Sequence, residues 1–418
     1  MNVNKILICA FSIIYMLHGM PMLGYRYPSM AYAAIIIALF FVLLLNIGVK
    51  SVLKIFPIFI IPILDVLISS SNALTFFQGV STLLQSLMMP MLALYLYKGN
   101  HRKMAAWLFS IYLGINFITC ITTYFGCQIF PNASRELVMA DATESPFYYM
   151  YLNANIGGFG FVYSMVLLLV LAICTIKNNK YIAKGRLMLI FAIMYVVGIV
   201  MTVIAAEYTT ALLLACASLL LLFVRSKFNV KRIIIWCVSF LFVFWAFKPL
   251  ISSGLMTIAD NVESATFSHR LSDLALSLDG RFTQENSDLD AREATYTKSL
   301  TSFIENPLGG WNLKSTGGHS YFFDALAKYG IFGLLLVILT LKIIYINYVK
   351  PLRTTFVYGY ANIAFLLITV MAIVNPRLFT DFVLFVVPIY VMLLVNKGGY
   401  SSRKFQKDSS RPIIDNRI

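Results

Sequence analysis

The chain alternates between long apolar runs and short polar connections. Runs of membrane-spanning length occupy about 6–22, 31–48, 55–71, 75–97, 104–126, 157–176, 187–206, 209–224, 233–250, 330–349, 355–374 and 379–395. A helix needs about 20 predominantly apolar residues to cross the hydrocarbon core of a bilayer. The pattern therefore predicts an all-α, polytopic membrane protein with about twelve transmembrane helices.

The composition agrees with this class of protein. Hydrophobic residues make up 60% of the chain and charged residues 12%, and the mean hydropathy is +0.80. Nearly all of the six cysteines fall in apolar runs, with no C-x-x-C pair. We therefore predict neither a disulfide framework nor a metal site from them.

Basic residues gather on every second connection between the apolar runs. They are Lys50, Lys54; Lys98, Arg102, Lys103; Lys177, Lys180, Lys184, Arg186; Arg225, Lys227, Lys231, Arg232; and Lys350, Arg353. Further basic residues follow in the polar tail, 396–418. Because cytoplasmic loops of membrane proteins carry the excess of Lys and Arg, we predict that these connections and both termini are cytoplasmic.

The remaining connections hold almost all the acidic residues. Of eighteen Asp and Glu residues, only Asp408 and Asp415 lie on the predicted inner side. The net charge of +15 is thus a signal of topology and not of a nucleic-acid partner. We predict four regions: helices 1–250, a large outer loop 251–329, helices 330–395, and a cytoplasmic tail 396–418 that contacts anionic membrane lipid.

The large outer loop contains two amphipathic patterns followed by a glycine-rich segment. The apolar positions are Phe267, Leu271, Leu274, Leu278 and then Tyr296, Leu300, Phe303, Ile304. The spacing predicts two helices lying on the membrane surface. Pro307 ends the second pattern, and Gly309, Gly310, Gly317 and Gly318 allow tight turns and close approach to a ligand.

His319 stands where a new helical pattern begins, and Gly330 ends or kinks that helix. A histidine at a helix N-terminus can move a proton, and the free N–H groups there can hold an anion. Two plainer interpretations remain open. In one the segment only leads the chain back into the membrane, and in the other His319 only caps the helix.

Three arginines recur in the large loop at intervals of eleven residues, and a few acids lie in or near spans. Arg270, Arg281 and Arg292 are suited to bidentate phosphate binding, although they could simply pair with acids of the same loop. Asp65 and Glu207 are further candidates, with structural alternatives: Asp65 could pair with a neighbouring helix, and Glu207 could lie in a surface turn.

One stretch resembles the O-antigen polymerase and O-antigen ligase superfamily. The order is DAREATYTKSLTSFIENPLGGW, then GGHSYFFDALAKYGIFGLLL. The family shows an Arg, an aromatic-containing helix, Asn-Pro-Leu-x-Gly, a His followed by Asn or Ser, and a helix ending in Gly-x-x-Gly. The matching residues are Arg292, Asn306, Pro307, Leu308, Gly310, His319, Ser320, Gly330 and Gly333. The motif covers only about 290–336, and the twelve-span plan agrees along the rest of the chain.

The chain departs from the family at the turn after the seventh span. The family often has an Arg there, in a Ser-Arg motif, where this chain reads Glu207-Tyr208-Thr209-Thr210. If the phosphate contact expected at this turn exists, another residue supplies it. Arg135 and Arg270 are the candidates.

The resemblance implies a glycosyltransferase of the bacterial cytoplasmic (inner) membrane, with its site on the extracytoplasmic side. The donor would be an oligosaccharide on undecaprenyl diphosphate. A polymerase moves the growing chain onto the next lipid-linked unit, making O-antigen or capsular polysaccharide, whereas a ligase moves it onto the lipid A core of lipopolysaccharide. We favour the polymerase because polymerases vary more in sequence and the match is loose. Other partners would be a chain-length regulator and a flippase.

The resemblance also implies roles for residues. His319 would take the proton of the acceptor hydroxyl. Arg270, Arg281 and Arg292 would hold the diphosphate, with Gly317, Gly318, Ser320 and Glu207 in support. No metal or other cofactor is predicted. Asp288-Leu289-Asp290 spells Asp-x-Asp, but the sequence shows a polar stretch there with no helix or strand pattern, so it is only a weak signal for a metal. A flippase or other transporter is the alternative class, disfavoured because the polar residues gather in one outer loop and not at the bilayer midplane.

Overall fold

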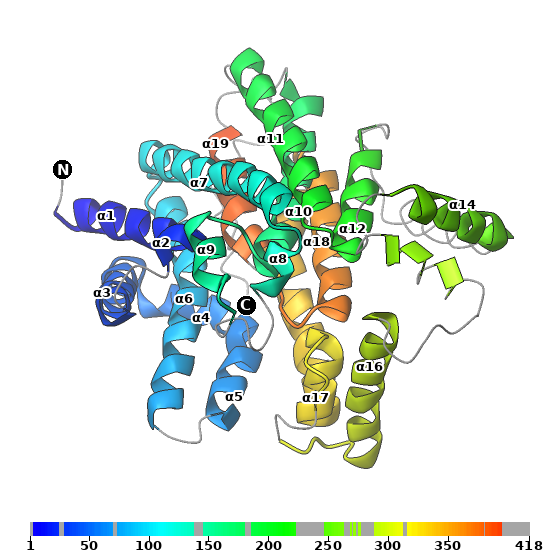
Figure 1. The fold of residues 1–418 in the computed structure, drawn as a ribbon. Coiled ribbons are helices and arrows are strands. Elements are labelled where there is room, and N and C mark those ends of the chain that lie inside the picture. Colours follow the sequence, from blue (N-terminus) through cyan, green and yellow to red (C-terminus); the bar gives the residue numbers. More distant parts are fainter. Residues whose placement is uncertain are drawn as a thin grey trace. The chain divides into compact units, whose positions relative to one another are not determined.

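The apolar runs form helices in the computed structural model (Figure 1). The structure describes residues 3–24, 29–69, 73–137, 145–179, 185–222, 246–262, 268–269, 271–272, 275–276, 288–311, 316–379 and 381–394. Within these ranges the chain is helical and contains no β-strand. The chain divides into two compact units, which comprise residues 1–224, 336–370 and 379–418, and residues 225–335 and 371–378.

Most helices belong to the first unit. They are α1 (Val3–His18), α2 (Pro21–Gly24), α3 (Ser29–Ile47), α4 (Val49–Ile55), α5 (Ile60–Ser69), α6 (Ala73–Lys98), α7 (Arg102–Ile129), α8 (Ala133–Glu136), α9 (Tyr148–Asn153), α10 (Phe159–Lys177), α11 (Gly185–Ala205), α12 (Thr209–Leu220), most of α18 (Tyr358–Val374) and α19 (Val387–Leu394). Helix α10 lies at the centre of this unit. Every residue from Met165 to Thr175 is buried, and α10 packs against α11 and α12 (Figure 1).

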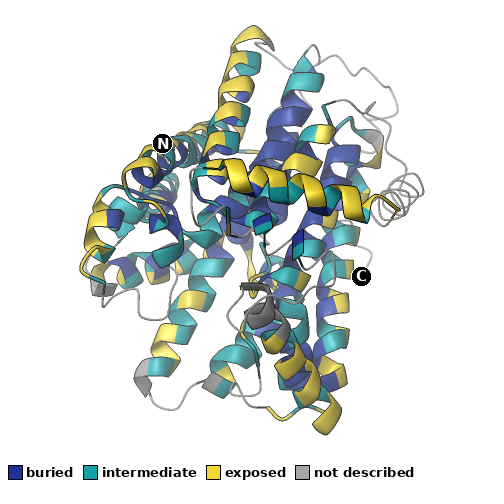
Figure 2. Ribbon diagram, turned by 45° about the vertical axis from the view of Figure 1, so that its right-hand side comes forward, coloured by how far each residue is buried: buried dark blue, intermediate teal, exposed yellow. Residues whose placement is uncertain are grey.

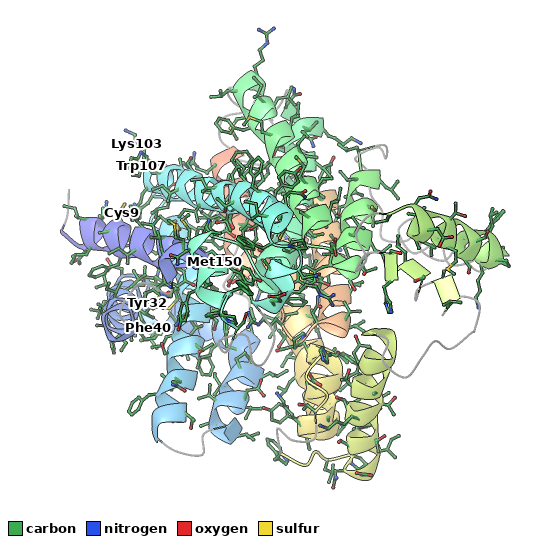
Figure 3. The ribbon with its side chains drawn as sticks, viewed as in Figure 1. Cys9, Tyr32, Phe40, Lys103, Trp107 and Met150 are labelled. Carbon is green, nitrogen blue, oxygen red and sulfur yellow. The ribbon has the colours of Figure 1, made fainter. Side chains whose placement is uncertain are left out.

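Other helices of the first unit expose apolar side chains instead. Helix α11 exposes Leu187, Ile190, Phe191, Val197 and Ile204, and such exposed residues appear in yellow in Figure 2. In Figure 3 the side chains of Lys103 and Trp107 point outward from the start of α7, and Trp107 is 66% exposed. A protein in water rarely leaves so many large apolar side chains uncovered, whereas lipid covers them without cost.

Six helical segments are long and apolar enough to cross a membrane. They are Val49–Ile68, Thr75–Lys98, Arg102–Ile129, Phe159–Lys177, Arg186–Ala205 and Tyr321–Arg353. Shorter apolar helices lie at Asn4–His18, Ala31–Ile47, Thr209–Leu220, Tyr358–Val374 and Phe382–Leu393, where further spans were predicted. Most of the run predicted at 233–250 lies outside the described residues. The helical, membrane-protein character is thus confirmed, while the number of twelve spans stays a prediction.

Several spans contain a local break. Between α4 and α5 the turn Phe56–Phe59 is 3₁₀ and contains Pro57, as expected where a proline removes a backbone hydrogen bond. Single π-helical turns occur at Tyr345–Val349 and Phe382–Val386. Asp65 lies in α5 and is half-buried.

The second unit contains the segment that the sequence singled out. It comprises α14 (Lys248–Asn261), α16 (Asp288–Glu305), the first half of α17 (Tyr321–Ile344) and the chain from Met371 to Leu378. The second predicted amphipathic helix lies in α16, which ends at Glu305, just before Pro307, as expected. Most of the first predicted amphipathic helix lies outside the described residues.

Candidate functional site

Helix α17 is broken at Gly330, and the loop before it fills the break. Gly330 has φ 60° and ψ −144°, which is not helical. The backbone N–H of Ile331 donates to the carbonyl of Pro307 at 2.9 Å, and that of Trp311 donates to the carbonyl of Lys328 at 2.9 Å. Two hydrogen bonds thus replace helical bonds lost at the break. The prediction of an end or kink at Gly330 is confirmed.

The contact between loop and break leaves no room for side chains. A Cβ at Gly330 would overlap the carbonyl oxygen of Pro307, and a Cβ at Gly309 would lie 2.5 Å from the carbonyl carbon of Tyr329. Both glycines also have positive φ, which disfavours other residues. The Asn-Pro-Leu-Gly-Gly stretch therefore has a structural role, because it fixes where the break in α17 lies.

The N-terminus of α17 is capped by two side chains of its own. The hydroxyl of Ser320 accepts a hydrogen bond from the N–H of Phe323 at 3.1 Å, which makes Ser320 the N-cap. One turn later, the Asp324 carboxylate accepts from the N–H of Ser320 at 3.3 Å and from that of Gly318 at 3.2 Å. This arrangement is close to a capping box and also suits the helix dipole.

Asp324 also joins α17 to α16. It is 7% exposed, and it accepts a hydrogen bond from the hydroxyl of Ser299 at 3.0 Å. The same hydroxyl accepts from the N–H of Gly317 at 2.9 Å. A Cβ at Gly317 would overlap the backbone carbonyl of Thr295, so only glycine lets this segment lie directly on α16. Helix α16, the glycine pair and the start of α17 form one hydrogen-bonded structure.

This network limits what the start of α17 can offer to a diphosphate. The N–H groups of Gly317, Gly318, Ser320, Tyr321 and Phe323 all donate to protein oxygens. The Asp324 carboxylate also lies among them and would repel a negatively charged diphosphate. That the remaining N–H groups bind a diphosphate stays a prediction.

His319 carries the exposed side chain among residues 316–320. It lies between Gly318, which has φ 78°, and the N-cap Ser320, and its side chain is exposed. The structural alternative, in which His319 caps α17, is wrong, because Ser320 holds that position. His319 also precedes the first residue of the helix, Tyr321, and does not begin the helix itself.

Of the three arginines, Arg292 lies on an element that contacts the His319 segment. It is in α16, seven residues before Ser299. Helix α16 packs on α17 around Ser299, because Ser299 bonds Asp324 and the ring of Tyr296 lies 5.5 Å from that of Phe323. Arg270 and Arg281 lie outside the described residues.

Glu207 lies in the first unit, in the turn between α11 and α12. It is half-buried with φ 53°. The hydroxyl of the next residue, Tyr208, donates to the carbonyl of Ser134 at 2.8 Å and so fastens the turn to α8. Burial raises the pKa of Tyr208, and the nearby charge of Arg135 opposes that rise. Of the two arginines proposed to replace the missing family Arg, Arg135 therefore lies beside this turn.

Sequence reasoning missed three residues of the second unit. Asp324 stands in the first turn of a helix, where acidic residues are common, and its partner Ser299 is 25 residues away. Asn375 follows α18, and its carbonyl accepts from the N–H of Tyr321 at 2.7 Å. Arg377 lies two residues further on and is exposed. One signal was available for Arg377: it is a basic residue in a short connection predicted to face outward.

Comparison with known proteins adds no assignment. The chain matches no protein-family model and no curated protein sequence. The resemblance to the O-antigen polymerase and ligase superfamily therefore stays a prediction. Among the residues that the structure describes, no three His, Cys, Asp or Glu side chains gather as metal ligands would.

Proposed function

We propose that this chain is a membrane glycosyltransferase that polymerises oligosaccharide repeat units carried on undecaprenyl diphosphate. It would make O-antigen or capsular polysaccharide in a bacterial cytoplasmic membrane. Its twelve spans would place the large loop, 251–329, and the site on the extracytoplasmic side. A ligase would use the same donor chemistry with the lipid A core as acceptor.

One observation carries the proposal. The residues that resemble the family lie on connected elements of one unit: α16 with Arg292, the loop from Asn306, the segment of His319 and the break at Gly330. Structural residues hold this arrangement together, while His319 is left exposed in its middle. A fold that only returned the chain to the membrane would not need an exposed imidazole on so firmly bonded a segment.

The chemistry follows from these residues. An acceptor sugar hydroxyl attacks the anomeric carbon of the donor, a new glycosidic C–O bond forms, and the bond to the diphosphate oxygen breaks. The diphosphate leaves with the electron pair, and its charge needs positive groups such as Arg292. The proton of the hydroxyl passes to the imidazole of His319. The products are a lengthened glycan on its lipid and a free polyprenyl diphosphate.

The first test is His319→Asn in a host strain that lacks the chromosomal copy of this gene. Asn keeps the hydrogen-bonding capacity but cannot accept the proton, so polymer formation should fall about 100-fold or more. The readout is the ladder of polysaccharide lengths on a gel, at equal protein amounts. The matched control is His269→Asn, an exposed histidine of the same unit.

Three results would count against the proposal. A full ladder in His319→Asn removes the base role. If the deletion strain itself still makes a normal ladder, or accumulates its repeat units on the cytoplasmic side, the chain is not the polymerase. Accumulation of repeat units on the cytoplasmic side would favour a flippase.

A further inference from the structure

The segment that follows α18 contacts the start of α17. After α18, Asn375 is 2% exposed and its carbonyl bonds the N–H of Tyr321 at 2.7 Å. Pro376 follows and restricts the backbone at that point. Arg377 comes next, belongs to the same unit, and is exposed.

Arg377 and His319 flank the same hydrogen bond. His319 is two residues before Tyr321, and Arg377 is two residues after Asn375. Two residues of chain span at most about 7 Å. Each residue therefore lies within about 7 Å of one end of this hydrogen bond, and both side chains are exposed.

An anion beside His319 would gain from a positively charged side chain. Five N–H groups at the start of α17 donate to protein oxygens, and the Asp324 carboxylate lies among them. Such an anion therefore gains little from these five N–H groups. The side-chain nitrogen of Asn375 is a buried donor with no acceptor among the described residues, so it adds a partial positive charge there.

The predicted topology puts Arg377 on the same side of the membrane as the segment of His319. The connection after the eleventh predicted span faces outward, as does that segment, and short outward connections are poor in Lys and Arg. Arg377 is therefore one of the few basic residues in the short outward connections.

We propose that Arg377 binds a phosphate group of the polyprenyl diphosphate beside His319. The identity of the ligand rests on the proposed function, whereas the positive site itself rests on the geometry. The guanidinium presents a planar fork to two phosphate oxygens. With Arg292 on α16, it holds the leaving group from a second segment of the chain.

The experiment measures binding to the purified, detergent-solubilised full chain. The probe is farnesyl diphosphate, a short soluble polyprenyl diphosphate; farnesol and inorganic diphosphate are the comparison ligands. Arg377→Ala should weaken farnesyl diphosphate binding about 10- to 100-fold. Arg377→Lys should lose less, because it keeps the charge without the fork. The matched control is Arg186→Ala, an exposed arginine in the first turn of α11.

The outcomes separate the two proposals. If the wild-type protein binds farnesyl diphosphate no more tightly than farnesol, the proposed donor is wrong. If the wild type discriminates and Arg377→Ala binds as well as Arg186→Ala does, only the role of Arg377 is wrong. Equal binding of inorganic diphosphate and farnesyl diphosphate would mean that the site takes free diphosphate. Should Arg377→Ala fail to fold, Arg377→Gln provides the same comparison.

Discussion

Replacing Asp324 by Ala tests how the His319 segment is held. The carboxylate accepts three hydrogen bonds, from the hydroxyl of Ser299 and from the N–H groups of Gly318 and Ser320. Gly318 is exposed, so water can replace its bond in the variant. Ser299 and Ser320 are buried, and their donors would be left without acceptors.

The two buried bonds set the magnitude. A hydrogen bond to a charged group contributes about 1.5–3 kcal/mol, so the variant should lower the free energy of opening this segment by about 3–6 kcal/mol. At about 1.4 kcal/mol per factor of ten, amide exchange should accelerate by about 10²- to 10⁴-fold. Asp324→Asn keeps one acceptor oxygen and should show about half of the loss in free energy.

Hydrogen–deuterium exchange with mass spectrometry measures this directly. The peptide covering 316–323 should exchange faster in Asp324→Ala, while peptides of α10 should not change. Asp260→Ala is the matched control, because Asp260 is an exposed acid at the end of α14 in the same unit. Unchanged exchange in 316–323 would refute the reasoning, since the carboxylate would then not hold the segment.

Two further predictions concern the break in α17 and the topology. Gly330→Ala should destabilise the protein by about 2–4 kcal/mol, because alanine strains this backbone and overlaps Pro307; tryptophan fluorescence during thermal unfolding measures it. Gly254→Ala is its control, since a Cβ there meets nothing within 4 Å in α14, and an equal loss in both variants would contradict the prediction. Reporter fusions are to be placed after Lys103, Arg186, Arg232 and Glu285. The first three should report cytoplasm and the last the outer side, and the reverse result at any of them would break the topology.

The sequence was sufficient to predict the helix positions and breaks that depend on neighbouring residues. The apolar run predicted at 157–176 is α10 at Phe159–Lys177, and the turn chemistry of Pro307 and Gly330 placed the end of α16 and the break in α17. These features depend on hydropathy and on backbone restrictions, which are properties of single residues and their neighbours.

The candidate site was only partly predictable, because its contacts join distant parts of the chain. His319 and Arg292 could be named from a motif, but the role of the Asp324 carboxylate could not. Nothing near Asp324 in the sequence indicates that Ser299 will donate to it, or that Asn375 will return to Tyr321. Such pairings arise from tertiary packing, and local periodicity carries no information about them.

The close contact at the break in α17 has a consequence for how this chain can change over generations. Gly309 and Gly330 each take up the space that a side chain on the other would need. A substitution at one of them removes the contact, and selection then no longer maintains the other. The two glycines should therefore be inherited or lost as a pair.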